Sequence, residues 1–227
     1  MLVADLFSKF GYKMEAYNHS IFNLNQKILK KISIRKDGWL RGFMQNASPN
    51  FDARPAEIKP FLLVIHNISL PPGEFGGSDI VHLFKNCLDH SQHPFYHHLI
   101  DLKVSAHFLI QRVGRINQFV SCNDCAWHAG QSDFLGKTHC NHFSIGIELE
   151  GTDFEKFERK QYVALSKLIN CLCQIYPIKA IVGHSDIAPS RKTDPGPYFN
   201  WRQLQKMTHL PNCFFPYGFT PRPESTK

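Results

Sequence analysis

Two short apolar runs, far apart in the chain, each lead into a histidine. Residues 61–65 precede His66, and residues 180–182 precede Gly183 and His184. A short continuous apolar run is typical of a strand buried on both faces, as in a sheet covered by helices. Because sites in such sheets form at the carboxyl ends of the strands, neighbouring strands would bring both imidazoles together.

The segment after the second run, residues 183–197, combines a lysine and a carboxylate on one constrained loop. Its three prolines limit the backbone, so the loop can hold a ligand group at low entropic cost. Lys192 and Asp194 are separated by one residue, which in extended chain places both side chains on the same side. The ammonium group is therefore expected to face whatever the carboxylate binds.

His66, His184 and Asp194 together form a ligand set that Zn²⁺ accepts in hydrolases. Two neutral imidazoles and one carboxylate leave a fourth position for water, whose pKa falls to about 7. A lone histidine at a strand end is more often structural, but here a lysine and an aspartate accompany it. We therefore expect one zinc ion per chain at these three residues.

The size and composition of the chain fit one domain with a small extension. Its 227 residues are expected to form an N-terminal extension of unknown role over 1–37 and a domain over 38–227. No apolar run approaches the ~18 residues that span a bilayer. Residues 1–30 also lack the layout of a signal peptide, because charged residues interrupt any apolar core. A cytoplasmic protein without membrane contact is expected.

The cysteines and the charge leave several options. Seven cysteines, an odd number, indicate free thiols, and Cys122 and Cys125 lack the second pair that a structural zinc site needs. A net charge of +7 admits nucleic acid, an anionic membrane or an anionic small substrate as partner. The densest basic stretch, residues 27–36, comes without a nucleic-acid fold signature, which favours a solvated basic face. No obligate protein partner is evident.

The remaining patterns predict an α/β domain with a mixed central sheet flanked by helices. Gly114 is expected to turn a hairpin, Ser78 to begin a helix and Pro177 to end one. Strands are expected over residues 104–110, 115–120 and 143–150, and helices over residues 79–88, 154–176 and 201–207.

Glu148 is a carboxylate in the middle of an otherwise apolar strand. Alternation places it on the same face as Gly146 and Glu150, so the sheet is open above it. Burying such a group costs desolvation energy unless it is paired or used in chemistry. A structural ion pair and a catalytic role are both open for Glu148 taken alone.

Five stretches of the sequence occur in this order: residues 63–77, 104–107, 126–130, 143–153 and 183–197. Together they resemble the AmpD family of zinc N-acetylmuramoyl-L-alanine amidases, the bacterial cytosolic enzymes that act on 1,6-anhydro-muropeptides in cell-wall recycling. The wider group includes phage amidases and peptidoglycan recognition proteins, but the stretches after His66 and around Glu148 resemble the cytosolic branch. The resemblance implies one peptidoglycan-recognition-like domain from about Gly38 to about Trp201.

The resemblance implies roles for five residues. The family's zinc ligands match His66, His184 and Asp194, its proton acceptor matches Glu148, and its transition-state-stabilising lysine matches Lys192. The implied reaction is hydrolysis of the amide between the lactyl group of anhydro-N-acetylmuramic acid and L-Ala of the stem peptide. Glu148 would move the proton of the attacking water to the leaving amine, and Lys192 would hold the developing oxyanion.

An anhydro-muropeptide is therefore the expected partner, with candidate contacts at Asn67, Lys103, Trp127, His128 and His139. Trp127 and His128 would line a groove for sugar or peptide. Lys103 and His139 stand where relatives tend to carry Arg for the stem-peptide carboxylates. Neither side chain fully replaces a bidentate arginine contact, so the stem-peptide preference is open.

Three alternatives remain: a non-catalytic peptidoglycan-recognition module, an amidase that acts on intact cell wall, and a nucleic-acid binder, which rests on charge alone. A module that had lost catalysis should lack at least one ligand or acid–base residue, whereas all five are present. The absence of a signal peptide and of a wall-binding repeat disfavours the wall enzyme, although phage amidases also lack signals.

Overall fold

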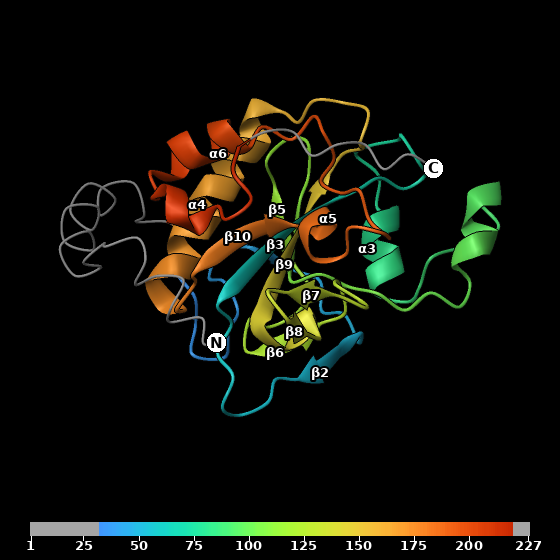
Figure 1. Ribbon diagram of the computed structural model, residues 1–227. Coiled ribbons are helices and arrows are strands. Elements are labelled where there is room, and N and C mark those ends of the chain that lie inside the picture. Colours follow the sequence, from blue (N-terminus) through green and yellow to red (C-terminus); the bar gives the residue numbers. More distant parts are fainter. Residues whose placement is uncertain (1–31, 220–227) are drawn as a thin grey trace. The chain divides into compact units, whose positions relative to one another are not determined.

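A six-stranded mixed sheet forms the centre of the computed structural model, which describes residues 32–219 (Figure 1). The strand order is β1-β5-β4-β9-β3-β10; β4 and β5 are antiparallel, and all other neighbours are parallel. The predicted mixed sheet is confirmed. Its strands are β1 (Met44–Gln45), β3 (Leu62–Ile68), β4 (Phe108–Ile110), β5 (Ile116–Gln118), β9 (Ser144–Glu150) and β10 (Ala180–Gly183).

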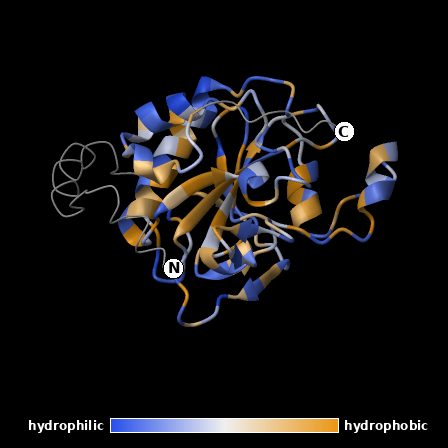
Figure 2. Ribbon diagram, in the orientation of Figure 1, coloured by the Kyte–Doolittle hydropathy of each residue, from blue (hydrophilic) through white to orange (hydrophobic). Residues whose placement is uncertain are grey.

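Helices and short strands cover the two faces of this sheet. Along β3, Leu63 and Ile65 pack with one cluster of core residues, and Leu62 and Val64 pack with another, because successive side chains point to opposite faces. The first cluster contains residues of α4 (Arg159–Ile175) and α6 (Trp201–Thr208), which lie side by side in Figure 1. The central strands are strongly hydrophobic in Figure 2, whereas hydrophobic and hydrophilic residues alternate along α4 and α6.

The opposite face carries smaller elements. Residues of α3 pack against the β4 end of this face, and α5 packs beside β3 and β10. These elements are α3 (Asp79–Phe84), α5 (His184–Ile187), β2 (Phe51–Ala53), β6 (Asp124–Ala126), β7 (Asp133–Phe134), β8 (Lys137–Thr138) and the 3₁₀ helices η1 (Pro94–Leu99) and η2 (Cys140–Phe143). The 3₁₀ helix η3 (Asn212–Phe214) lies on the other face, where Phe214 packs against the cluster that contains residues of α4 and α6.

The predicted hairpin at Gly114 is confirmed, but its first strand is shorter than expected. Gly114 has φ +80°, and a Cβ there would lie 2.8 Å from the carbonyl oxygen of Lys160. β4 starts at Phe108 rather than at residue 104; the amide of His107 already donates to the carbonyl of Gly146 in β9, but the chain before His107 bonds to loops. The amide of Ser105, for example, donates to the carbonyl of Trp127.

Two predicted helices have different ends. The helix expected over 79–88 ends at Phe84, and Asn86 adopts φ +56°, so Cys87 is exposed instead of lying on the buried face. The helix expected from residue 154 begins at Arg159, because Glu158 forms a capping box with Gln161. It ends before Pro177 as predicted, and α6 extends one residue beyond its predicted end, to Thr208.

The expected extension falls largely outside the described residues, as do most of its basic stretch and the chain after residue 219. Residues 32–37, which the prediction assigned to the extension, contact the domain. Ile32 and Ile34 pack against the core cluster that includes α4 and α6, and Ser121 Oγ donates to the carbonyl of Asp37 at 2.8 Å. By the contacts within the chain, Lys31 ends one compact unit and Ile32 begins the next. We therefore propose a domain boundary near residue 31 rather than 37.

Within residues 32–219, no helix combines the length and hydropathy that are needed to cross a bilayer.

Arg54 ties β2 to the start of the central strand β9. Its guanidinium donates to the carbonyl oxygens of His142 at 2.6 Å, Asp124 at 2.5 Å and Ser144 at 3.0 Å. Burial lowers the pKa of Arg54 from its usual value, but these carbonyls compensate part of the desolvation of the charge. The residue thereby fixes where β9 begins.

Arg54→Lys is expected to destabilise the domain by about 2 kcal/mol or more, because one ammonium group cannot serve the separate carbonyls that the guanidinium reaches. Urea unfolding followed by tryptophan fluorescence measures the change. The exposed Arg41→Lys is the matched control and should shift stability by less than about 0.5 kcal/mol. Equal stability of the two variants would contradict this role.

Candidate metal centre

Strand register brings the candidate site residues together. β3 pairs with β9 so that His66 lies opposite Glu148, and β3 pairs with β10 so that Ile65 lies opposite Gly183. His184, the first residue of α5, therefore follows β10 beside His66. The prediction that the two histidine strands are neighbours is confirmed. The prediction that His66 ends its strand is wrong, because β3 continues its pairing with β9 to Ile68.

The side chains of His66, His184 and Asp194 converge in a compact triangle. His66 Nδ1 lies 2.9 Å from Asp194 Oδ2 and 3.0 Å from His184 Nδ1, and His184 Nδ1 lies 3.1 Å from the same carboxylate oxygen. Three tetrahedral zinc ligands at about 2.0–2.1 Å from the ion would be separated by about 3.3 Å. The triangle thus has nearly the size that a metal ion requires, and the group could hold one.

The outer contact of His184 sets which ring nitrogen faces the triangle. Its Nε2 lies 3.0 Å from the carbonyl oxygen of Ala129. A carbonyl only accepts hydrogen bonds, so Nε2 carries the proton and Nδ1 keeps a lone pair. Arg191 strengthens this arrangement, because its guanidinium also donates to the carbonyl of Ala129, at 2.7 Å. Sequence reasoning missed Arg191, although it adjoins the candidate Lys192.

The electrostatics of the cluster suit metal binding. Burial is the main cause that lowers the pKa of His66 to about 4, and the charge of the nearby His184 is the second cause. Burial alone would raise the pKa of Asp194, but the close imidazoles of His184 and His66 outweigh it and lower the pKa. Near neutral pH, His66 is therefore neutral and Asp194 is ionised, which are the states that bind a cation.

Short-range contacts hold the loop that carries Asp194 against β10. The amide of Ser185 donates to the carbonyl of Asp194 at 2.9 Å. Gly183 permits the close approach, because a Cβ there would lie 2.7 Å from Pro195 Cδ. Two of the three candidate ligands thus come from one closed loop, as the prolines of this segment had suggested.

Glu148 and Lys192 lie beside the triangle. Burial, followed by the charge of Asp194, raises the pKa of Glu148 well above its usual value, and the charge of Lys192 opposes this shift. The charge of Lys192 also contributes to lowering the pKa of His66, so Lys192 lies near enough to act on the cluster. Glu148 Oε2 is buried and has no hydrogen-bond partner among the described residues. This favours a chemical role over the structural ion pair that the sequence left open.

The residues predicted to contact substrate occupy different surroundings. Asn67 and Trp127 are partly exposed; Asn67 donates to Asp153 at 2.7 Å, and Trp127 Nε1 donates to Asp52 at 2.6 Å. His128 is buried behind His66, so its predicted place on the wall of a groove is wrong. Its hydrogen-bond partner, Ser144, lies on the same face of β9 as Glu148, but no local pattern in the sequence joins Ser144 to His128.

Lys103 and His139 are both exposed, and no contact joins either of them to the triangle. His139 has φ +59°, and its ring stacks on His142. It lines a hollow of about 450 Å³ to which none of the metal-candidate residues belongs. Their contact with stem-peptide carboxylates stays a prediction.

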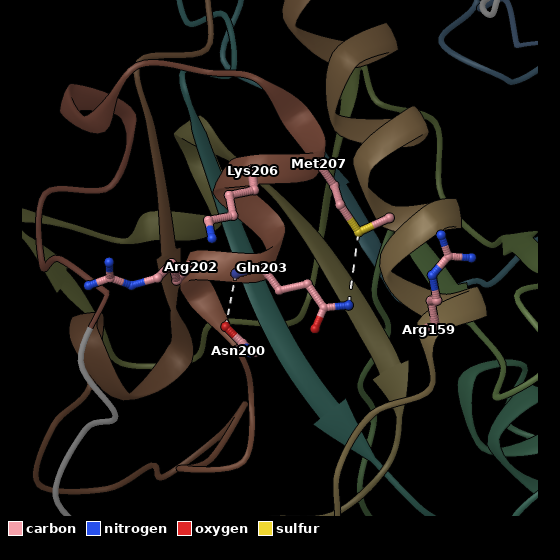
Figure 3. Close-up of a pocket in the computed structure, with 6 residues that line it drawn as sticks. All are labelled: Arg159, Asn200, Arg202, Gln203, Lys206 and Met207. Carbon is pink, nitrogen blue, oxygen red and sulfur yellow. Dashed lines mark hydrogen bonds between the residues drawn. The ribbon is translucent and has the colours of Figure 1, made fainter.

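A second hollow, of about 410 Å³, lies between α4 and α6 (Figure 3). Figure 3 shows Arg159 on the opposite side of Gln203 from Arg202 and Lys206, so the cationic groups do not converge on one point. None of the metal-candidate residues belongs to it. Its lining residues are Arg159, Asn200, Arg202, Gln203, Lys206 and Met207.

Comparisons with known proteins agree on one family. The model of the N-acetylmuramoyl-L-alanine amidase family matches residues 58–197. The 1,6-anhydro-N-acetylmuramyl-L-alanine amidase AmpD of Escherichia coli K12 is 50% identical over 172 residues, covering 75% of this chain and 94% of that protein. The AmpD protein of Haemophilus influenzae is 47% identical over 178 residues, covering 77% and 97%. A crystal structure of selenomethionine AmpD has a TM-score of 0.75 at 48% identity, covering 77% of this chain and 98% of that one.

The metal-free protein is expected to lose stability as the pH falls from 6.5 to 4. Burial lowers the pKa of His66 to about 4 and that of His107 to about 3, from 6.5 in the unfolded chain. The unfolded chain therefore binds more protons in this window, so stability is complete above pH 6.5 and declines below it. Urea unfolding with chelator present measures the slope, and His107→Gln should reduce it. A slope of zero would contradict the burial of neutral histidines.

Asp194→Ala is expected to weaken binding of a divalent metal ion by more than about 100-fold. Loss of a group that only hydrogen-bonds a metal ligand typically weakens binding 10–100-fold, and loss of a ligand itself should weaken it more. Elemental analysis gives the stoichiometry, and competition with a chelator gives the affinity. The control is Asp101→Ala, an exposed carboxylate that should bind metal like the parent protein. Unchanged affinity of Asp194→Ala would exclude the triangle as the metal site.

Proposed function

This chain belongs to the N-acetylmuramoyl-L-alanine amidase family, and we propose that it is a zinc enzyme that removes the stem peptide from 1,6-anhydro-muropeptides during cell-wall recycling. The bond cleaved is the amide between the lactyl group of 1,6-anhydro-N-acetylmuramic acid and L-Ala. The observation that carries this proposal is the His66–His184–Asp194 triangle beside Glu148, whose buried Oε2 has no hydrogen-bond partner among the described residues. The names of two relatives that are about half identical to this chain support the choice of substrate.

Zinc is the metal that best fits the donor set. Two imidazole nitrogens and one carboxylate oxygen suit Zn²⁺ in catalytic sites, which keep a fourth position open. Bound there, Zn²⁺ would polarise the scissile carbonyl and lower the pKa of a water molecule to about 7. His66, His184 and Asp194 would hold the ion, one per chain.

Glu148 is the group that we assign to proton transfer. It lies opposite His66 in the strand register, so the two side chains lie on the same face of the sheet, which supports this assignment. Its raised pKa increases its affinity for the proton of the attacking water, and the same proton then goes to the nitrogen of the leaving L-Ala. Because Oε2 accepts no bond from the described protein residues, it is available to the water and then to the amine.

Lys192 is the group that we assign to the carbonyl oxygen. Negative charge develops on this oxygen as the carbonyl carbon becomes tetrahedral. A preorganised ammonium group stabilises that charge and typically contributes 10²–10³-fold in turnover. The closed loop that positions Asp194 also positions Lys192, so the ligand and the charge-stabilising group move together.

The charge of the chain is consistent with an anionic substrate. Muropeptides carry carboxylates on D-Glu and often on diaminopimelate, and a net charge of +7 favours their approach. We propose Asn67 and Trp127 as contacts near the scissile bond, and Lys103 and His139 as contacts with the stem peptide. All seven cysteines are free, which supports a reducing compartment such as the cytoplasm.

The zinc-loaded protein is expected to release stem peptide from purified 1,6-anhydro-muropeptides, with products identified by mass. Lys192→Ala and Glu148→Gln should keep zinc but lose about 100-fold or more in kcat, because each removes a group that acts in the transition state. Lys206→Ala, in the hollow between α4 and α6, is the matched control and should keep full activity.

The outcomes separate the parts of this proposal. Full activity of both variants would refute the roles of Glu148 and Lys192. Faster release from intact sacculi than from 1,6-anhydro-muropeptides would indicate a wall-directed amidase. Zinc binding without any release would indicate a recognition module.

A further inference from the structure

A buried histidine lies directly behind one of the candidate metal ligands. His66 Nε2, on the side of the ring opposite the triangle, is 3.0 Å from His128 Nδ1. The other nitrogen of His128, Nε2, is 3.0 Å from Ser144 Oγ at the start of β9. The two rings meet edge to face, with centroids 5.1 Å apart. A chain of hydrogen bonds thus leads from β9 to a metal-facing imidazole.

The surroundings leave His128 little freedom to adopt another position. A Cβ at Gly146 would lie 2.4 Å from His128 Cγ, so the ring occupies the space left by the missing side chain. Asn141 Oδ1 accepts from the backbone amides of His128 and Ala129, at 3.3 and 2.9 Å. Both the ring and its backbone are therefore held in place.

The direction of the hydrogen bonds follows from the chemistry of imidazole. A neutral ring has one donor and one acceptor nitrogen. If His66 binds metal through Nδ1, its single proton is on Nε2, and His128 Nδ1 must accept it. His128 Nε2 then carries the proton of that ring and donates to Ser144 Oγ. This single assignment of protons gives every ring nitrogen of His66 and His128 a suitable partner.

We propose that His128 is a positioning residue, which accepts the Nε2 proton of His66 and so keeps Nδ1 of that ring directed at the metal. This inference rests on the metal site of the proposed function. The adjacent carbonyl of Ala129 does the same for His184. Residues 128 and 129 together therefore orient both imidazole ligands, one through a side chain and the other through the backbone.

Substitution of His128 tests the proposal by zinc affinity, measured by competition with a chelator. His128→Leu fills the site but offers no acceptor, and it is expected to weaken zinc binding 10–100-fold. His128→Asn can place Oδ1 near the position of Nδ1 and should recover most of that loss. Ser144→Ala removes only the last acceptor and should have a smaller effect than His128→Leu. Unfolding of each metal-free variant shows whether the fold is kept.

The tautomer of His128 gives a second readout, which is independent of variants. In the zinc-loaded parent protein, ¹⁵N spectra of the histidine rings should show His128 protonated on Nε2 and not on Nδ1. Protonation on Nδ1 would overturn the proposal, because that nitrogen could not accept from His66. The same result decides the matter if His128→Leu does not fold.

Failure of this inference is distinguishable from failure of the metal site itself. If the parent protein binds no zinc, the proposed function fails. If the parent protein binds zinc and His128→Leu, still folded, binds it within about twofold as tightly, only the role of His128 is refuted. Loss of affinity in His128→Asn equal to that in His128→Leu would also count against it, because the acceptor would then be irrelevant.

Discussion

The parallel pairing of β3 with both β9 and β10 is the constraint on which the site depends. It sets His66 opposite Glu148 on one side and next to the end of β10 on the other. A slip of one residue in either register would turn Glu148 or His66 to the opposite face of the sheet, toward the core covered by α4 and α6. The loop after β10 then needs only to fold back for Asp194 and Lys192 to join the cluster.

The same strand shows how surroundings assign different roles to two carboxyl groups. Glu150 and Glu148 share one face of β9. Glu150 is buried, and its two oxygens accept from the backbone amides of Gly76 and Arg112, at 2.6 and 2.8 Å. It therefore holds the loop that follows β3. Glu148 Oε2 has no such donor among the described residues, so it remains free for chemistry.

Much of this arrangement could be predicted from sequence because the determining signals are local. The apolar runs before His66 and His184 revealed adjacent buried strands, and alternation revealed the face of Glu148. The place of His128 could not be predicted, because it depends on space left by Gly146, 18 positions away. The bonds of Arg54 to residues 124–144 likewise join distant segments and have no local pattern. The early end of α3 at Phe84 reflects the unusual backbone of Asn86, which apolar spacing does not encode.

The missing side chain of Gly146 has a consequence for how this protein family can diverge. Any side chain there would collide with the imidazole at position 128, and retreat of that imidazole would leave His66 without its acceptor. The two positions are thus expected to covary: a homologue with alanine at the first must carry a smaller polar residue at the second. The need to bind a metal ion at His66 would in this way limit which residues can replace Gly146 during evolution.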